Sequence, residues 1–393
     1  MGTWLCAIAL ALPTVAQSEA GSIVVSPMFE KAELGAILHE SGVTDPGVLS
    51  ICDAAFSAWL EEFNRNLEEF REKNLANIEH NRRQAAAHDR QDHTPPPYPD
   101  VYENWRVQRS SMDQQLLNDI AALLNAASGQ KWKILAQRRY RSRALQYVAR
   151  VGVRRAVDLA EIAESFVDGA SEDADDMISA YEAELDAAID MFVFRFPALN
   201  EQTIRNYQSA ESIELRHRDF RADRLAAERV RFAVEDVNKR FVVRFSRSLS
   251  HDVADAFVEH AFAMFYPQVY ATSPVEYVAA RLKNERLSFQ TMQNVQQHLQ
   301  VYAPAQRRLR RQIADAWERW DTLATRVVLL DMRSEIEEEG GGDAHLVWTG
   351  FPARDAWMRN RQLVHNTCQQ IRNSLSQAEL DALPADVQLM LSW

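Results

Sequence analysis

Glycine, proline and cysteine are all scarce in this 393-residue chain, which has 12 Gly, 13 Pro and 3 Cys. Glycine and proline each make up about 3% of the residues, against roughly 7% and 5% in average proteins. A β-sandwich, a propeller or an α/β enzyme with glycine-rich loops needs more of both, so this composition disfavours all three folds. Three cysteines are also too few for a scaffold held together by disulfides.

Positive charge and long apolar runs are in short supply as well. The chain has 44 Lys and Arg against 56 Asp and Glu, a formal net charge of −12. A general nucleic-acid binder should be basic in order to neutralise phosphates, so we expect no nucleic-acid partner. The sequence has no run near the roughly 20 apolar residues that a transmembrane helix needs. With 47% hydrophobic and 9% aromatic residues, the chain can still bury a core, which argues against wholesale disorder.

The N-terminus carries one short apolar run, Trp4–Leu12, which is followed by Pro13 and then by small residues. This order is typical of a signal peptide, and the small residues offer two cleavage patterns that end at Ala16 and Ala20. No Lys or Arg precedes the run, a departure that a start codon annotated too late would explain. We therefore predict that residues 1–20 are a signal peptide and that the mature chain is extracytoplasmic, either periplasmic or secreted. The alternative is the start of a short buried helix.

Cleavage would remove Cys6, which lacks the small preceding residues of a lipoprotein signal, and would leave Cys52 and Cys368. These two thiols could pair in an oxidising compartment if the fold brings them together, or they could stay buried as free thiols. The sequence leaves both arrangements open.

Apolar residues recur every three or four positions in four long windows, and this spacing predicts four amphipathic helices. The four stripes are Cys52, Phe56, Trp59, Phe63, Leu67 and Phe70; Ile178, Tyr181, Leu185, Ile189, Phe192 and Phe196; Val230, Val234, Val237, Phe241, Phe245 and Leu249; and Met292, Val295, Leu299, Tyr302, Leu309, Ile313, Trp317 and Trp320. Each stripe must find a partner, so the chain should form packed helices.

Breaks between these helices are few. Four prolines between Thr94 and Asp100 exclude a helix there and favour an extended linker over a docking site for a proline-binding module. We therefore predict an N-terminal helical segment over 21–93, a proline-rich linker over 94–104, and a helical body with halves at 105–250 and 251–393.

Local signals also mark individual helix ends. Capping-box sequences, in which a Ser is followed three residues later by Glu or Gln, begin at Ser111, Ser273 and Ser376 and predict helix starts. Pro197 and Pro267 are predicted to end the helices that precede them.

One stretch has the residue types of a metal site. His80, His88, Asp89, Asp92 and His93 could together hold a divalent ion. Ligands on one helix should lie three or four residues apart, whereas the first two histidines are eight apart and the last two are five apart. A polar helix end before the linker is the better interpretation.

The acidic cluster Glu172, Asp173, Asp175 and Asp176 could supply carboxylates for acid–base chemistry. It follows a Gly-Ala-Ser stretch and precedes a helical pattern, so we interpret it as a helix start, where the helix dipole favours negative charge.

Two histidines have an acid beside them in the chain, in the pairs His251–Asp252 and Glu259–His260. Neither pair has a recognisable Ser or Cys nucleophile with it. The sequence also contains no nucleotide-binding or nucleophile-elbow motif.

Arginine is by far the more frequent basic residue, with 38 Arg against 6 Lys. It clusters at Arg138, Arg139, Arg141 and Arg143, again at Arg150, Arg154 and Arg155, and again at Arg307, Arg308, Arg310 and Arg311. The guanidinium fork suits carboxylates and phosphates. Because acids are in excess elsewhere in the chain, we expect these arginines to pair with neighbouring helices more than with anionic partners.

The segment Leu375–Leu380 reads Leu-Ser-Gln-Ala-Glu-Leu and resembles the LTxxQ motif of the exported all-helical proteins that include the periplasmic stress chaperone Spy. Ser stands here for Thr, and Glu for Gln. Leu287–Gln290 is similar in kind, with its Gln one residue early. The resemblance implies an extracytoplasmic helical protein that holds non-native clients without ATP, although family members are far shorter than this chain.

We therefore expect an all-α protein whose long amphipathic helices form an elongated or bundle-like arrangement after the signal segment. The leading functional hypothesis is an extracytoplasmic, non-enzymatic binding or chaperone-like protein that acts on protein or peptide partners through amphipathic helix surfaces. The alternative is a structural or assembly protein that self-associates by coiled-coil helices, and a metal-dependent enzyme is a third hypothesis. We assign no catalytic, cofactor-binding or metal residue. An exposed apolar groove would favour partner binding, whereas complete burial of the stripes would favour a scaffold.

Overall fold

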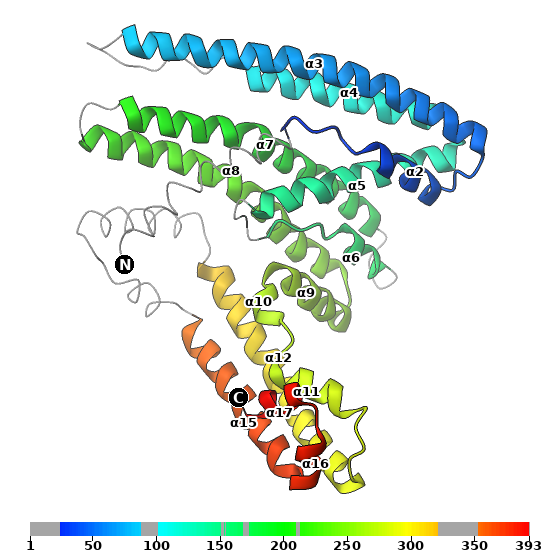
Figure 1. The fold of residues 1–393 in the computed structure, drawn as a ribbon, viewed down its shortest axis with the longest axis vertical. Helices are drawn as coiled ribbons and strands as arrows, with labels where there is room; N and C mark the ends of the chain where they lie inside the picture. Colours follow the sequence, from blue (N-terminus) through cyan, green and yellow to red (C-terminus); the bar gives the residue numbers. More distant parts are fainter. Residues whose placement is uncertain are drawn as a thin grey trace. The chain divides into compact units, whose positions relative to one another are not determined.

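Most of the described residues of the computed structural model are helical. The described ranges are 24–87, 101–150, 153, 155–167, 173–209, 213–320 and 353–392, without the side chains of 77–87, 197–198, 200–224 and 320. Within these ranges every element is a helix and no strand occurs, which confirms the all-α class. The chain divides into two compact units, Met1–Ser250 and His251–Trp393 (Figure 1).

Unit 1 is built from long helices. They are α2 (Lys31–Glu40), α3 (Pro46–Ala87), α4 (Val101–Leu123), α5 (Ala126–Arg150), α6 (Ala160–Glu164), α7 (Ala174–Ser209) and α8 (Ile213–Ser248). Helix α3 begins with Pro46 at its first position, and the Asp45 carboxylate accepts hydrogen bonds from the next two backbone amides at 2.8 and 3.0 Å. Both features satisfy or remove amides that a helix start leaves unpaired.

The apolar stripe of α3 is buried along α4, which lies beside it (Figure 1). All six stripe residues that the spacing predicted are at most 7% exposed. Phe63 and Phe70 both contact Trp105, with ring centroids 5.7 and 5.3 Å apart. The N-terminal helical segment therefore shares a core with the helices that follow it.

Helices α7 and α8 form a second close pair (Figure 1). The Tyr181 ring near the start of α7 stacks on Phe241 near the end of α8, at a centroid distance of 3.9 Å. The two helices therefore run antiparallel, and their predicted stripes bury each other, with only Phe196 partly exposed.

One predicted helix end in unit 1 is wrong, because α7 continues through Pro197 to Ser209. A proline inside a helix removes one backbone hydrogen bond and crowds the preceding turn, at a cost of about 3 kcal/mol. Helix α7 makes its most extensive contacts with α8, and packing between helices supplies most of the stability of a helix in a protein, so it can offset a cost of this size.

Two further boundaries also differ from prediction. Ser111 lies inside α4, where its neighbour Met112 packs into the core, so the capping-box sequence there does not begin a helix. Helix α4 starts at Val101, so residues 101–104, which we assigned to the linker, are helical. The proline cluster itself lies outside the described residues, as does the predicted signal peptide at 1–20.

Unit 2 contains α9 (His251–Phe265), α10 (Pro267–Tyr270), α11 (Pro274–Leu282), α12 (Phe289–Trp320), α15 (Arg354–Ser374), α16 (Gln377–Ala382) and α17 (Ala385–Leu391). Helix α15 packs along α12 (Figure 1). The capping boxes at Ser273 and Ser376 are both formed, and α9 ends just before Pro267, which confirms these three predictions.

Cys52 and Cys368 are both free and fully buried, one in each unit. The structure therefore contains the free-thiol arrangement and no bond between these two residues. Among the described helices, none combines the length and the apolar character that crossing a membrane requires.

Candidate functional site

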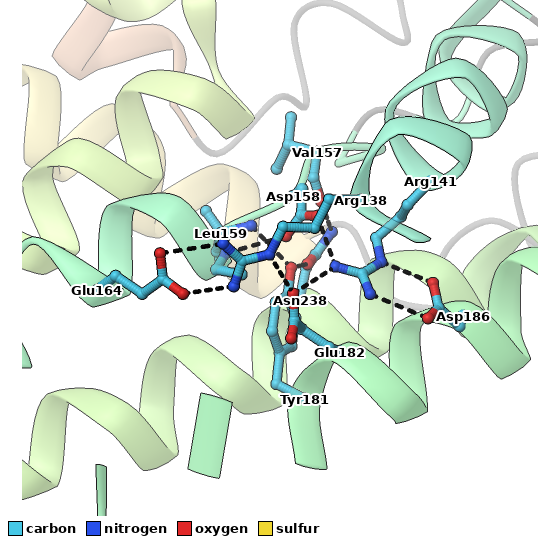
Figure 2. A network of polar contacts seen from close by, with 11 residues as sticks. Arg138, Arg141, Val157, Asp158, Leu159, Glu164, Tyr181, Glu182, Asp186 and Asn238 are labelled. Carbon is cyan, nitrogen blue, oxygen red and sulfur yellow. Dashed lines mark hydrogen bonds and ion pairs between the residues drawn. The ribbon is translucent and has the colours of Figure 1, made fainter. Parts of the chain in front are cut away.

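A network of charged side chains joins α5, α7 and the irregular segment around α6 (Figure 2). Its centre is Arg141, whose side chain is only 2% exposed. Its Nε and Nη2 donate to the two carboxylate oxygens of Asp186 at 2.6 and 2.9 Å. Its Nη1 donates to Asp158 at 2.8 Å and to Glu182 at 2.9 Å. One arginine therefore binds three carboxylates from two separate parts of the chain.

Arg138 extends the network by one turn of α5. Its Nε donates to Glu182 at 2.7 Å, and both of its Nη atoms bond to Glu164 at the end of α6. The two arginines are three residues apart on α5, and Glu182 and Asp186 are four apart on α7, so each pair lies on one helix face. This spacing allows two helices to bind each other through several ion pairs at once.

Beneath the charges, Asn238 of α8 satisfies the backbone of the buried segment before α6 (Figure 2). Its Nδ2 donates to the carbonyls of Arg155 and Val157 at 2.5 and 3.0 Å. The Tyr181 hydroxyl donates to the Asn238 Oδ1 at 2.7 Å and accepts from the Leu159 amide at 2.9 Å. An irregular segment can be buried only when its polar backbone groups find partners, and these two side chains provide them.

The surroundings set the protonation of the network. Burial alone would raise the pKa of the Glu182 carboxyl, but hydrogen bonds from Arg138 and Arg141 outweigh it and lower that pKa. Burial raises the pKa of the Tyr181 hydroxyl well above its usual value. At neutral pH the carboxylate is ionised and the phenol is neutral, so the network acts as a set of fixed hydrogen bonds that clamp the helices.

A second set of charges lies further along α7, where Asp190 follows Asp186 by one more turn. The Arg106 Nη1 donates to Asp190 at 2.8 Å. Beside it, the Arg109 Nε lies 3.5 Å from Asp113, and burial raises the pKa of that acid to about 6 despite the attraction of the guanidinium. Glu182, Asp186 and Asp190 thus form an acidic row on α7 that binds arginines from both α4 and α5.

Most of the clustered arginines that the structure describes pair with acids of the same chain, as we expected, while Arg154 lies outside the described residues. Besides Arg138 and Arg141, Arg143 lies 3.4 Å from Glu33, and the fully buried Arg155 lies 3.6 Å from Glu235. In unit 2, Arg310 binds both oxygens of Glu276 at 2.9 Å.

The acidic cluster and the two histidine–acid pairs that the sequence singled out do not come together in one site among the described residues. Asp175 and Asp176 stand in the first turn of α7, which confirms that the acidic cluster begins a helix. His251 is the first residue of α9 and is exposed, whereas Glu259 pairs with Arg307 at 3.4 Å. The His260 ring bonds to the backbone of its own helix.

The metal candidate cannot be placed. The side chain of His80 and the residues His88, Asp89, Asp92 and His93 lie outside the described part of the chain. Among the residues that are described, no group of three or more His, Cys, Asp or Glu side chains could hold a metal ion.

The two motif-like stretches meet in unit 2. Glu379 accepts hydrogen bonds from the Ser376 amide at 2.9 Å, as a capping box requires, and from the Ser288 amide at 2.8 Å, just before α12 begins. It also accepts from the Thr291 hydroxyl at 3.2 Å. These hydrogen bonds lower the pKa of the Glu379 carboxyl to about 2. One carboxylate therefore caps the start of two helices.

Sequence reasoning predicted the capping box that Glu379 forms with Ser376, but it missed the role of Asn238 and the contact of Glu379 with the start of α12. Asn238 lies beside the predicted apolar stripe of α8, next to Val237, and the regular spacing of that stripe gave no sign of its role. The second partner of Glu379 lies 91 residues away in the chain, and nothing local to either stretch predicts that contact.

Comparisons of the chain with protein-family models, curated proteins and solved structures find no match. The fold and the network define the class of the molecule as an all-α protein whose helices are held by buried ion pairs. The resemblance to the LTxxQ proteins depends on the two short stretches alone.

Proposed function

We propose that this protein is a non-enzymatic, extracytoplasmic scaffold that binds protein or peptide partners through the outer faces of its helices. The observation that carries the proposal is the use of the apolar stripes. Those of α3, α7 and α8 are buried against other helices, so the strongest apolar surfaces hold the molecule together. The network around Arg141 then fixes the helices relative to one another within unit 1.

The exposed apolar side chains of the described residues favour a scaffold rather than a single apolar cradle, because they are spread over eight helices. They are Ile51 and Leu75 on α3, Val107 and Leu123 on α4, Ile134 on α5, Met191 on α7, Val243 on α8, Phe289 and Val301 on α12, Met358 on α15, and Leu389 on α17. Single exposed apolar residues are normal on protein surfaces, whereas a client-holding surface needs a contiguous patch.

Helix α4 offers a place to test partner binding. Its outer face forms a shallow hollow lined by Val107, Ser110, Ser111, Gln114, Gln115, Asn118 and Asp119. A photocrosslinking amino acid in place of Val107, which is 54% exposed, should give a discrete adduct in the extracytoplasmic fraction of the native host. The same amino acid in place of the fully buried Ile120 is the matched control. Only intramolecular products at Val107 would contradict the proposal that the outer face of α4 binds a partner.

Location is tested separately. Residues 1–20 fused to a reporter enzyme that is active only outside the cytoplasm should give activity, and replacing the apolar run Trp4–Leu12 with polar residues should abolish it. An inactive fusion would remove export from the proposal and leave the scaffold part standing.

A second candidate function is chaperone-like holding of non-native clients, which the resemblance of Leu375–Leu380 to the LTxxQ motif suggests. The purified mature chain should then suppress aggregation of a model client without nucleotide. No effect at stoichiometric ratios would exclude this candidate and leave the scaffold proposal untouched.

A further inference from the structure

The first half of α12 is unusual because it carries no formal charge. A quarter of the chain is Asp, Glu, Lys or Arg, yet none occurs between Phe289 and Gln306. The inner side of this stretch packs into the core of unit 2 through Val295 and Tyr302. Its outer side is exposed and consists mainly of glutamines. The helix therefore has two stripes, of which only the inner one has a partner among the described residues.

The outer stripe has the spacing of a coiled-coil seam. Nine residues between Phe289 and Pro304 are exposed, and five of them lie along one line, namely Phe289, Gln293, Gln296, Gln300 and Ala303. The steps between them are four, three, four and three, an average of 3.5 residues, which is the repeat that lets two helices stay in contact over several turns. A glutamine amide both donates and accepts hydrogen bonds, so glutamines can pair with one another across such a seam.

The distribution of charge on the chain indicates which partner can bind this stripe. The chain has a net charge of −12, so two copies repel each other over most of their surfaces. A face without charge is where a second copy can approach without burying an unpaired ion, and depletion of charge is typical of interface cores. A strongly charged partner would find no complementary group on this face.

The side chains of this stripe are also complementary in size to those of a second copy of α12 that runs in the opposite direction. If two copies of α12 lie antiparallel with Gln296 facing Gln296, Phe289 of one copy lies opposite Ala303 of the other. Gln293 then lies within one residue of the position opposite Gln300. The largest side chain of the stripe meets the smallest, as close packing requires, and a two-fold axis makes both ends of the contact identical.

We propose that two copies of this chain associate through the outer face of α12, antiparallel about Gln296. This inference deepens the proposed scaffold function by naming a second copy as a partner. It uses different residues from the hollow on α4, so the two can fail independently.

Disulfide crosslinking tests the register. In a Cys6→Ser background, where Cys52 and Cys368 are buried, Gln296→Cys should form a covalent dimer under mild oxidation. Phe289→Cys alone should not, but a mixture of Phe289→Cys and Ala303→Cys chains should. Efficient self-crosslinking of Phe289→Cys would indicate a parallel pair and overturn the proposal, as would the absence of any crosslink.

Sedimentation equilibrium of the full chain tests the association itself. The parent chain should be a dimer at micromolar concentration, and Phe289→Glu should weaken dimerisation at least about tenfold, since tenfold corresponds to only about 1.4 kcal/mol. The side chain is 85% exposed at the first position of a helix, so glutamate there should not disturb the fold.

Met358→Glu is the matched control for that variant, because Met358 is an apolar residue on α15 that is 54% exposed. It should leave the dimer unchanged. A parent chain that stays monomeric at about 100 µM, or equal weakening by both variants, would overturn the proposal. The crosslinking result at Val107 would stand in either case.

Discussion

At the scale of single residues, a few polar side chains provide the hydrogen-bond partners that the buried polar groups of unit 1 require. Asn238 makes three hydrogen bonds, two of them to carbonyls of a segment that is not helical. A polar residue in an apolar stripe is costly unless each of its groups is paired. The asparagine is tolerated because α8 places it directly against that segment.

Asn238→Ala should lower the free energy of unfolding by about 2–4 kcal/mol, because it leaves two buried carbonyls and the Tyr181 hydroxyl without this partner. Denaturant titration followed by circular dichroism measures the change. Asn118→Ala, at an exposed position on α4, should change stability by less than about 0.5 kcal/mol. Similar effects of the two variants would show that the asparagine is not a structural centre.

Gly129→Ala should destabilise the protein by about 1–3 kcal/mol, the usual cost of overpacking. A Cβ at this position would lie 2.9 Å from the carbonyl oxygen of Ala121, so α4 and α5 would have to move apart. Thermal unfolding measures the loss. In contrast, Gly35→Ala in α2 meets nothing within 4 Å and should stabilise by about 0.5–1 kcal/mol, because alanine is the better helix former. A stabilising change at Gly129 would contradict this packing.

At the scale of elements, the helices are joined by two kinds of contact. Apolar stripes supply most of the buried surface, but they are similar from helix to helix and so specify neighbours weakly. The acidic row of α7 faces arginines on α4 and α5 in a fixed register, and Glu379 links the starts of α12 and α16. These polar contacts select which helices lie together.

Arg141→Met should cost about 2–4 kcal/mol, because it keeps most of the side-chain volume but leaves three carboxylates around a site that has lost its cation. The matched variant is Arg240→Met, whose guanidinium is 46% exposed and pairs with Glu184 and Asp236. Surface pairs of this kind contribute about 0–1 kcal/mol. Chemical denaturation of both variants would test the difference, and equal losses would show that burial of the network does not matter.

Glu379→Gln should make unit 2 less sensitive to acid. The pKa of the carboxyl falls from its usual 4.5 to about 2 in the folded protein, so its contribution to stability is complete above pH 4.5 and is lost as pH falls towards 2. The difference in unfolding temperature between parent and variant should therefore shrink over that range. Asp381→Asn on the same helix is the control and should show a much smaller difference. If the difference in unfolding temperature between the parent and Glu379→Gln stays constant from pH 5 to pH 2, the lowered pKa of Glu379 does not contribute to stability.

At the scale of the whole molecule, the chain forms two compact units, each with its own buried thiol. Cys52 lies in the aromatic core between α3 and its neighbours, and Cys368 lies in the apolar cluster of α11, α12, α15 and α17. Burial raises the pKa of both thiols, that of Cys368 to about 11. Each thiol can therefore report the opening of its own unit.

Both thiols should resist a thiol reagent in the native protein and react as denaturant is added. In a Cys6→Ser background, Asn238→Ala should lower the denaturant concentration at which Cys52 is labelled and leave Cys368 unchanged. Glu379→Gln should do the reverse. Mass spectrometry of the labelled peptides distinguishes the two sites. If both thiols shift together in both variants, the units unfold as one.

The sequence by itself determined the helical class, the apolar stripes of α3, α7 and α8, and the capped starts at Ser273 and Ser376. Each of these depends on residues within one or two turns of each other, so spacing alone is sufficient. It misplaced the helix end at Pro197 because tertiary packing can outweigh a local helix breaker, and residue spacing does not show that packing. Only the tertiary structure decided which arginine meets which acid, that Asn238 satisfies a distant segment, and that Glu379 caps two helices. Those contacts join residues that are tens of positions apart in the chain, and no local pattern records the distance between them in space.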